Sequence, residues 1–102
     1  MRQAKSETTI DNDVVRVTTW TIAAGESTGA HRHELDYVVV PIRGGQLTMT
    51  SREGVVQTSM EPGHGYFRRA GIEHEVSNDG AATVVFVEVE VLRCVEDGPG
   101  VA

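Results

Sequence analysis

The chain has little of three things that would place it in a special class: cysteine, basic charge and long apolar runs. Cys94 is the only cysteine among 102 residues, so no disulfide can form within the chain. Nine basic residues against fifteen acidic ones give a formal net charge of −6, which removes any electrostatic reason to bind nucleic acid or an anionic membrane. The longest apolar stretches, such as residues 84–87, are far too short to span a bilayer. We therefore expect a cytoplasmic protein.

The length and composition predict a single small domain. A chain of 102 residues, 39% of them hydrophobic, has the composition of a globular protein with room for one modest core. The first 13 residues are polar and carry no apolar signal segment. We expect residues 1–102 to form one domain with a core over about 14–92 and flexible termini, including a frayed tail over 96–102.

Helical periodicity is also missing, since no window has apolar residues at spacings of three and four. Short alternating or β-branched runs are separated instead by turns that contain glycine, which is the pattern of strands. About eight such strands predict an all-β domain, a closed antiparallel barrel or a sandwich. The clearest runs are residues 14–22, 35–42, 46–51, 55–59, 66–69, 74–77 and 83–92.

Three of the four histidines fall in two patterned segments. Residues two apart on a strand share a face, so His31 and His33 project together, as two ligands of one metal ion must. His74 offers a third imidazole just after a turn with glycine. Three neutral imidazoles suit Zn, Fe, Ni, Cu or Mn and leave positions open for water or substrate. A lone His-x-His pair is a weak signal and favours two surface histidines, so the flanking residues decide between that interpretation and a metal site.

The flanking residues resemble the two motifs of the cupin superfamily. The first motif, G-x5-H-x-H-x3-E-x6-G, is matched at Gly25, His31, His33 and Gly44. The second, G-x5-P-x-G-x2-H-x3-N, is matched at Gly63, Gly71, His74 and Asn78. The resemblance covers about residues 14–91 and implies a single-domain jelly-roll β-barrel with a divalent metal ion (Fe, Zn, Ni or Mn) at its open mouth.

Two positions depart from the motifs: Tyr37 stands where the family has a metal-binding glutamate, and Arg69 where it has proline. Without the glutamate, an ion held by three neutral imidazoles keeps its full charge and favours anionic chelators such as an enolate or a carboxylate. Glu34 and Asp36 have the wrong strand parity to replace it, unless a bulge re-aims one of them. Relatives with three-histidine sites that cleave diketones or oxidise thiols show that such a site supports chemistry.

Tyr37 and Arg68 are the candidate catalytic residues beside the metal. Tyr37 is a wall of the pocket, a hydrogen-bond donor to bound water or substrate, or a phenolate ligand, and the last requires its usual pKa of about 10 to fall far. By alignment to the family pattern, Arg68 faces the barrel interior. It then pairs with Glu88 or Glu90, or it receives the carboxylate of a substrate.

Other side chains that could carry chemistry have plainer interpretations. His64 follows Pro62 and Gly63 and is expected in a turn away from the metal, and Cys94 is expected to be inert. Residues 14–22 predict an apolar edge strand that pairs with a second copy in a homodimer. Trp20, on that strand, is expected in the core or in the dimer interface.

Two classes of function remain. The first is a metal-dependent enzyme for a small metabolite with a carboxylate or a carbonyl group, in which Tyr37 and Arg68 orient the substrate. Iron would favour a dioxygenase, whereas zinc, nickel or manganese would favour a lyase, isomerase or hydrolase. The second is a non-catalytic module that binds a metal and a small ligand. The sequences of residues 31–41 and 66–74 also resemble those of a subgroup of cupins associated with β-alanine degradation. This resemblance implies a small carboxylate-bearing or amino-acid-derived ligand.

Overall fold

The computed structural model describes residues 1–92, which fold into strands joined by loops. None of these residues forms a helix long and apolar enough to cross a membrane. The strands are β1 (Arg2–Gln3), β2 (Lys5–Asp11), β3 (Val15–Ile22), β4 (Glu26–Ser27), β5 (His31–Arg32), β6 (Asp36–Arg43), β7 (Gly45–Ser51), β8 (Gly54–Met60), β9 (Tyr66–Arg68), β10 (Glu73–Ser77) and β11 (Val84–Val91).

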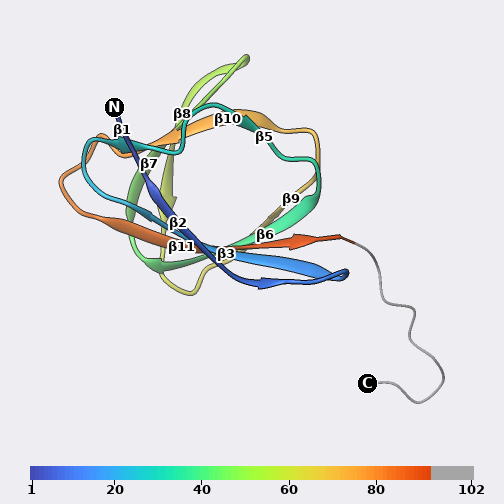
Figure 1. Ribbon diagram of the computed structural model, residues 1–102. Coiled ribbons are helices and arrows are strands. Elements are labelled where there is room, and N and C mark those ends of the chain that lie inside the picture. The colour runs from blue at the N-terminus through green and yellow to red at the C-terminus, as the bar shows by residue number, and fades with distance from the viewer. Residues whose placement is uncertain (93–102) are drawn as a thin grey trace.

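The strands form two sheets on opposite sides of the molecule (Figure 1). One has the order β1-β4-β10-β7-β8, with β5 also paired to β10, and the other has the order β2-β3-β11-β6-β9. The prediction of an all-β jelly roll is confirmed, but the expected closed barrel is corrected to two separate sheets. The reason is that each ladder ends at edge strands, β2 and β9 in one sheet and β1 and β8 in the other, which do not pair across the gap.

The chain crosses from one sheet to the other between β6 and β7, and it turns there at a motif glycine. A Cβ atom on Gly44 would lie 2.6 Å from the carbonyl oxygen of Met60 and 2.8 Å from Cδ of Pro62. Only a residue without a side chain allows this close approach to the backbone that follows β8. The spacing of Gly44 in the first motif is therefore a packing requirement of the fold.

The N-terminal residues differ from the expectation of a flexible terminus. Residues 2–11 form β1 and β2, and β2 pairs along β3. All seven residues of β2 are exposed, so this edge strand lacks the alternation of apolar and polar residues by which strands are identified. Ala4, between the two strands, is buried in the core. The folded domain thus begins well before residue 14.

The position of β2 also corrects the prediction that residues 14–22 form a free edge. β3 lies between β2 and β11, with Trp20 opposite Ser6 on one side and Phe86 on the other. Trp20 packs against the hydrophobic core and is not placed on a free edge. Because backbone pairing to β2 occupies that side of β3, this strand cannot pair with a second copy. The homodimer stays a prediction without that interface.

Alternation along the central strands builds the core between the sheets. On β6, Tyr37, Val39 and Pro41 point inward while their neighbours are partly exposed. Leu47 of β7 and Val84 of β11 are completely buried and approach from different sheets. This packing holds the β5–β10 region, which carries the histidines, against the second sheet.

Asn78, which ends the second motif, fastens the end of β10 to the rest of the fold. Its fully buried amide nitrogen donates to the carbonyl oxygens of Ile22 and Ala82, each at 2.8 Å. Its amide oxygen accepts a hydrogen bond from the backbone nitrogen of Gly80 at 2.9 Å. An amide is required here because the side chain must donate and accept at once.

We predict that Asn78→Asp lowers the free energy of unfolding by about 3 kcal/mol, because a carboxylate cannot donate to the two carbonyl groups and its charge would be buried. Urea denaturation measures the change. Asn12→Asp is the matched control, since the exposed Asn12 uses only its side-chain oxygen, which accepts from the backbone of Val14 and Val15. Equal effects of the two substitutions would contradict this account of Asn78.

Candidate metal centre

The backbone brings three histidines together from two segments 41 residues apart. His31 on β5 lies directly opposite His74 on β10 in the antiparallel ladder. His33 lies just past β5, where its N–H donates to Ile72 O at 2.9 Å and its carbonyl accepts from Gly71 N at 2.7 Å. Gly71 has a φ of +100°, in the left-handed region that favours glycine. The second motif glycine therefore shapes the loop that holds His33.

The ring nitrogens converge on one point. The Nε2 atom of His33 lies 3.0 Å from Nε2 of His31 and 3.1 Å from Nε2 of His74. The ligand nitrogens of all three rings lie within 4.8 Å of one another. Two nitrogen ligands at about 2.1 Å from one ion, at right angles to each other, are about 3.0 Å apart. The two short separations are those of ligands that share a metal ion.

The protons of the three rings support the same conclusion. Nδ1 of His31 lies 2.9 Å from the carbonyl oxygen of Gly29, which can only accept, so this nitrogen carries the proton and Nε2 carries a lone pair. Nε2 of His33 has one proton or one lone pair, and it faces two neighbouring nitrogens. A cation shared by three lone pairs satisfies all of them, and the Gly29 carbonyl is the kind of partner that orients a histidine ligand. The donor set fits a divalent ion.

The electrostatics of the cluster keep two of its imidazoles, those of His33 and His74, neutral. Burial, followed by the proximity of the other two histidines, lowers the pKa of His33 to about 4. Burial lowers the pKa of His74 to about 4 as well, with contributions from His31 and from the guanidinium of Arg68. Since metal ligation requires unprotonated nitrogen, both rings are ready to bind an ion at neutral pH.

No carboxylate joins the histidine cluster within residues 1–92. Glu34 points away and forms an exposed ion pair with Arg32 at 3.5 Å. Asp36 accepts a hydrogen bond from the backbone nitrogen of Ala70 at 2.8 Å. The bulge that would have re-aimed one of them is absent from this segment of the described chain. The position of the family glutamate is therefore not filled by a neighbouring acid.

One buried acidic group approaches the cluster from the other sheet. Glu88 on β11 is 9% exposed, and its Oε2 atom lies 3.9 Å from Nε2 of His33. Burial, and then the charge of Glu90, raises the pKa of Glu88 to about 7, although a hydrogen bond from Trp20 opposes the shift. The sequence predicts Glu88 only as a partner for Arg68. Glu88 is a buried acidic residue on a strand that is otherwise mostly valine and phenylalanine, and this unusual position in the sequence could have indicated that it lies beside the histidine cluster.

Tyr37 forms a wall of the centre. Its ring stacks on that of His33, with centroids 3.9 Å apart and planes inclined by 20°. It is 2% exposed, and burial raises the pKa of its hydroxyl further above the usual value. The hydroxyl forms no hydrogen bond to another described residue. This environment favours a neutral phenol, as a wall or a hydrogen-bond donor, over a phenolate ligand.

Arg68 differs from its predicted place in a buried interior. It is exposed at the end of β9, a three-residue edge strand, and its guanidinium donates to Phe67 O at 3.1 Å and lies over the Tyr66 ring. The predicted ion pair of Arg68 with Glu88 or Glu90 does not form. Because Arg68 lies on an edge strand, water solvates its guanidinium group and no buried carboxylate is needed. Arg68 nevertheless lines a cavity of about 200 Å³ together with Tyr37, Tyr66 and His74.

The remaining candidates lie apart from the centre. His64 is exposed in a turn, where its backbone nitrogen donates to Glu61 O at 3.0 Å, and it is not part of the histidine cluster. Cys94 and the tail over 96–102 lie outside the described residues.

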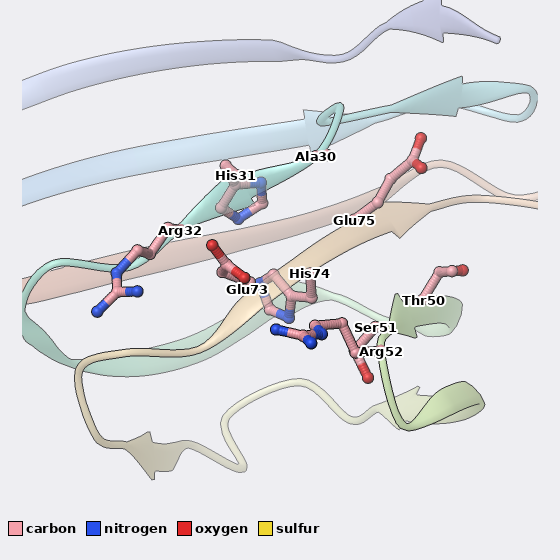
Figure 2. Close-up of a pocket in the computed structure, with 9 residues that line it drawn as sticks. All are labelled: Ala30, His31, Arg32, Thr50, Ser51, Arg52, Glu73, His74 and Glu75. Carbon is pink, nitrogen blue, oxygen red and sulfur yellow. The ribbon is translucent and has the colours of Figure 1, made fainter.

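A larger hollow of about 500 Å³ opens beside the cluster (Figure 2). His31 and His74 both line it, so a ligand in this hollow has access to two of the three rings. Its other walls come from β5, from β10 and from the end of β7 with the turn that follows. That turn, which joins β7 to β8, contains Arg52.

Comparisons with known proteins agree with this fold. The family model of the cupin domain matches residues 18–90. The β-alanine degradation protein BauB of Pseudomonas aeruginosa is 47% identical over 89 residues, which cover 87% of this chain and 94% of that protein. A crystal structure of a cupin domain from Bordetella pertussis Tohama I, 42% identical, has a TM-score of 0.86 and covers 88% of this chain and 94% of its own. An RmlC-like cupin with a double-stranded β-helix from Methanocaldococcus jannaschii, 14% identical with a TM-score of 0.74, shares the fold over 89% of this chain and 82% of its own.

We predict that His31→Ala, His33→Ala and His74→Ala each abolish stoichiometric metal binding, because two imidazoles hold a divalent ion far less tightly than three. His64→Ala is the matched control and should keep the metal content of the wild type. Elemental analysis of the four purified variants makes the comparison. An empty site in His64→Ala, or a full one in His74→Ala, would show that the ligand set is wrong.

Proposed function

This chain belongs to the cupin family, and from that premise we propose that it is a metal-binding protein that acts on a small metabolite with a carboxylate or a carbonyl group. The relative from Pseudomonas aeruginosa is named for β-alanine degradation, which supports a small, amino-acid-derived metabolite as the ligand. The reaction class follows from the metal: oxygenation for iron, and enolisation, isomerisation or hydrolysis for zinc, nickel or manganese.

The observation that carries the proposal is the composition of the donor set. Three imidazoles converge without a carboxylate among them in the described chain, and burial lowers the pKa of two of them, His33 and His74. A divalent ion bound there would keep its full charge and polarise an oxygen atom of an anionic ligand. A site with four protein ligands that included a glutamate would attract anions less strongly.

The side chains around the rings have separate tasks in this proposal. Tyr37 fixes the plane of His33 by stacking, and its free phenol group can donate to a bound oxygen atom. Arg68 has no carboxylate partner among residues 1–92 and can present its planar fork to the carboxylate of a ligand in the cavity that it shares with Tyr37. Both residues thereby orient the ligand and exclude water from one side of the centre.

We predict opposite effects of two substitutions at Tyr37. Tyr37→Phe should retain the metal and weaken the binding of malonate, a chelating dicarboxylate, by about tenfold if the hydroxyl donates to the bound anion, since such a bond is worth about 1.5–3 kcal/mol. Tyr37→Glu should raise metal affinity and weaken malonate binding, because the added carboxylate lowers the net charge at the centre. Calorimetric titration of the metal-loaded variants measures both constants.

Loss of metal from Tyr37→Phe would identify a phenolate ligand and overturn the three-histidine account. The proposal of an anion-attracting centre would fail if Tyr37→Glu bound malonate as tightly as the wild type. Phe67→Leu serves as a control of similar apolar character on the exposed side of β9, and it should change neither constant.

A further inference from the structure

A second group of charged side chains surrounds the open side of the histidine cluster, away from Tyr37 and Arg68. Two adjoining hollows, of about 500 and 540 Å³, share the same central lining. The shared residues come from β5, β10 and the β7–β8 turn: Arg32, Ser51, Arg52, Glu73 and His74. We call this region the outer groove. Because His74 belongs to it, a ligand in the outer groove is next to the metal centre.

Some of the charges in the outer groove already have partners. Arg32 forms an ion pair with Glu34 at 3.5 Å. Glu75, which lines the hollow of about 500 Å³, accepts a short hydrogen bond of 2.6 Å from the hydroxyl of Ser27. These two side chains are therefore held by the protein itself.

Arg52 and Glu73 are different, because the side chain of neither residue makes a hydrogen bond or an ion pair with any residue in 1–92, including each other. In Figure 2 the guanidinium of Arg52 extends toward the His74 ring, and the carboxylate of Glu73 lies on the side of Arg32. The outer groove thus presents one cation and one anion without partners on either side of a metal-ligand ring.

Both side chains stand on firmly placed backbone. Glu73 immediately precedes His74 on β10 and pairs with Arg32 in the ladder. The turn that carries Arg52 is closed by the pairing of Ser51 with Gly54, and the Ser51 hydroxyl donates to the carboxylate of Glu53 at 3.0 Å. Glu53 is thereby engaged within the turn and does not neutralise Arg52.

We propose that the ligand of the outer groove is a small zwitterion, with its carboxylate bound by Arg52 and its ammonium group bound by Glu73. This inference rests on the proposed function in placing that ligand beside the metal, and it narrows the ligand class from an anion to an amino acid. A planar guanidinium matches a carboxylate with two parallel hydrogen bonds, and a carboxylate accepts from an ammonium group. A ligand with one charge would satisfy only one of the two side chains.

The test uses β-alanine, propionate and propylamine as probes in calorimetric titrations of the metal-loaded protein. β-Alanine carries both a carboxylate and an ammonium group, propionate carries only the carboxylate, and propylamine carries only the ammonium group. The wild type should bind β-alanine about tenfold more tightly than either of the others. Arg52→Gln should weaken β-alanine and propionate and leave propylamine unchanged. Glu73→Gln should weaken β-alanine and propylamine and leave propionate unchanged.

Glu53→Gln is the matched control. It removes a negative charge next to Arg52 in the sequence, but the Glu53 carboxylate already accepts a hydrogen bond from the Ser51 hydroxyl. It should leave the affinity for β-alanine unchanged, and metal content measured on every variant should equal that of the wild type. Wild-type affinity for β-alanine in both Arg52→Gln and Glu73→Gln would overturn the inference. So would equal affinities of the wild type for β-alanine and propionate.

The same titrations separate this inference from the proposed function. If the metal-loaded protein binds malonate but shows no binding of β-alanine at millimolar concentration, the zwitterion is excluded and the anion-attracting metal centre stands. If the protein takes up no metal while β-alanine still depends on Arg52 and Glu73, the metal centre fails and the charge pairing in the outer groove stands.

Discussion

The structure depends on the convergence of three imidazole nitrogens. Nitrogen atoms with lone pairs repel one another at separations of 3.0 and 3.1 Å, unless a cation lies among them. The fold holds them there through the β5–β10 ladder and through the loop at Gly71, which fixes the backbone of His33. Burial keeps the rings of His33 and His74 neutral, so the same arrangement that is unfavourable in isolation becomes a favourable site for a divalent ion.

The charge around that site depends on the residue at the glutamate position of the first motif, which is Tyr37 in this chain. An aromatic ring at Tyr37 supports His33 by stacking and adds no charge. The buried acid of the region, Glu88, approaches His33 from the opposite sheet at 3.9 Å and remains outside the histidine cluster. The histidine cluster therefore contains no carboxylate in the described chain, and arginines line the hollows beside it although the chain as a whole is acidic.

The sequence predicted those features that depend on local spacing. The alternation of His31 and His33, and the interval from Gly71 to His74, follow from strand geometry and loop shape, so the site could be located within a few residues. Features set by tertiary neighbours could not be predicted in this way. Glu88 meets His33 only because two sheets face each other, Arg68 is exposed because β9 is an edge, and β2 forms by backbone pairing with no apolar pattern.

The central claim is that three imidazoles, and no other protein group, hold the metal. The most direct test is a crystal structure of the metal-loaded protein with anomalous diffraction measured at the absorption edge of the bound metal. The account predicts one ion at about 2.0–2.2 Å from Nε2 of His31, His33 and His74, with water or a small ligand at the other positions. An oxygen atom of Glu88 or Tyr37 bound to the ion, or an ion bound away from the three rings, would contradict it.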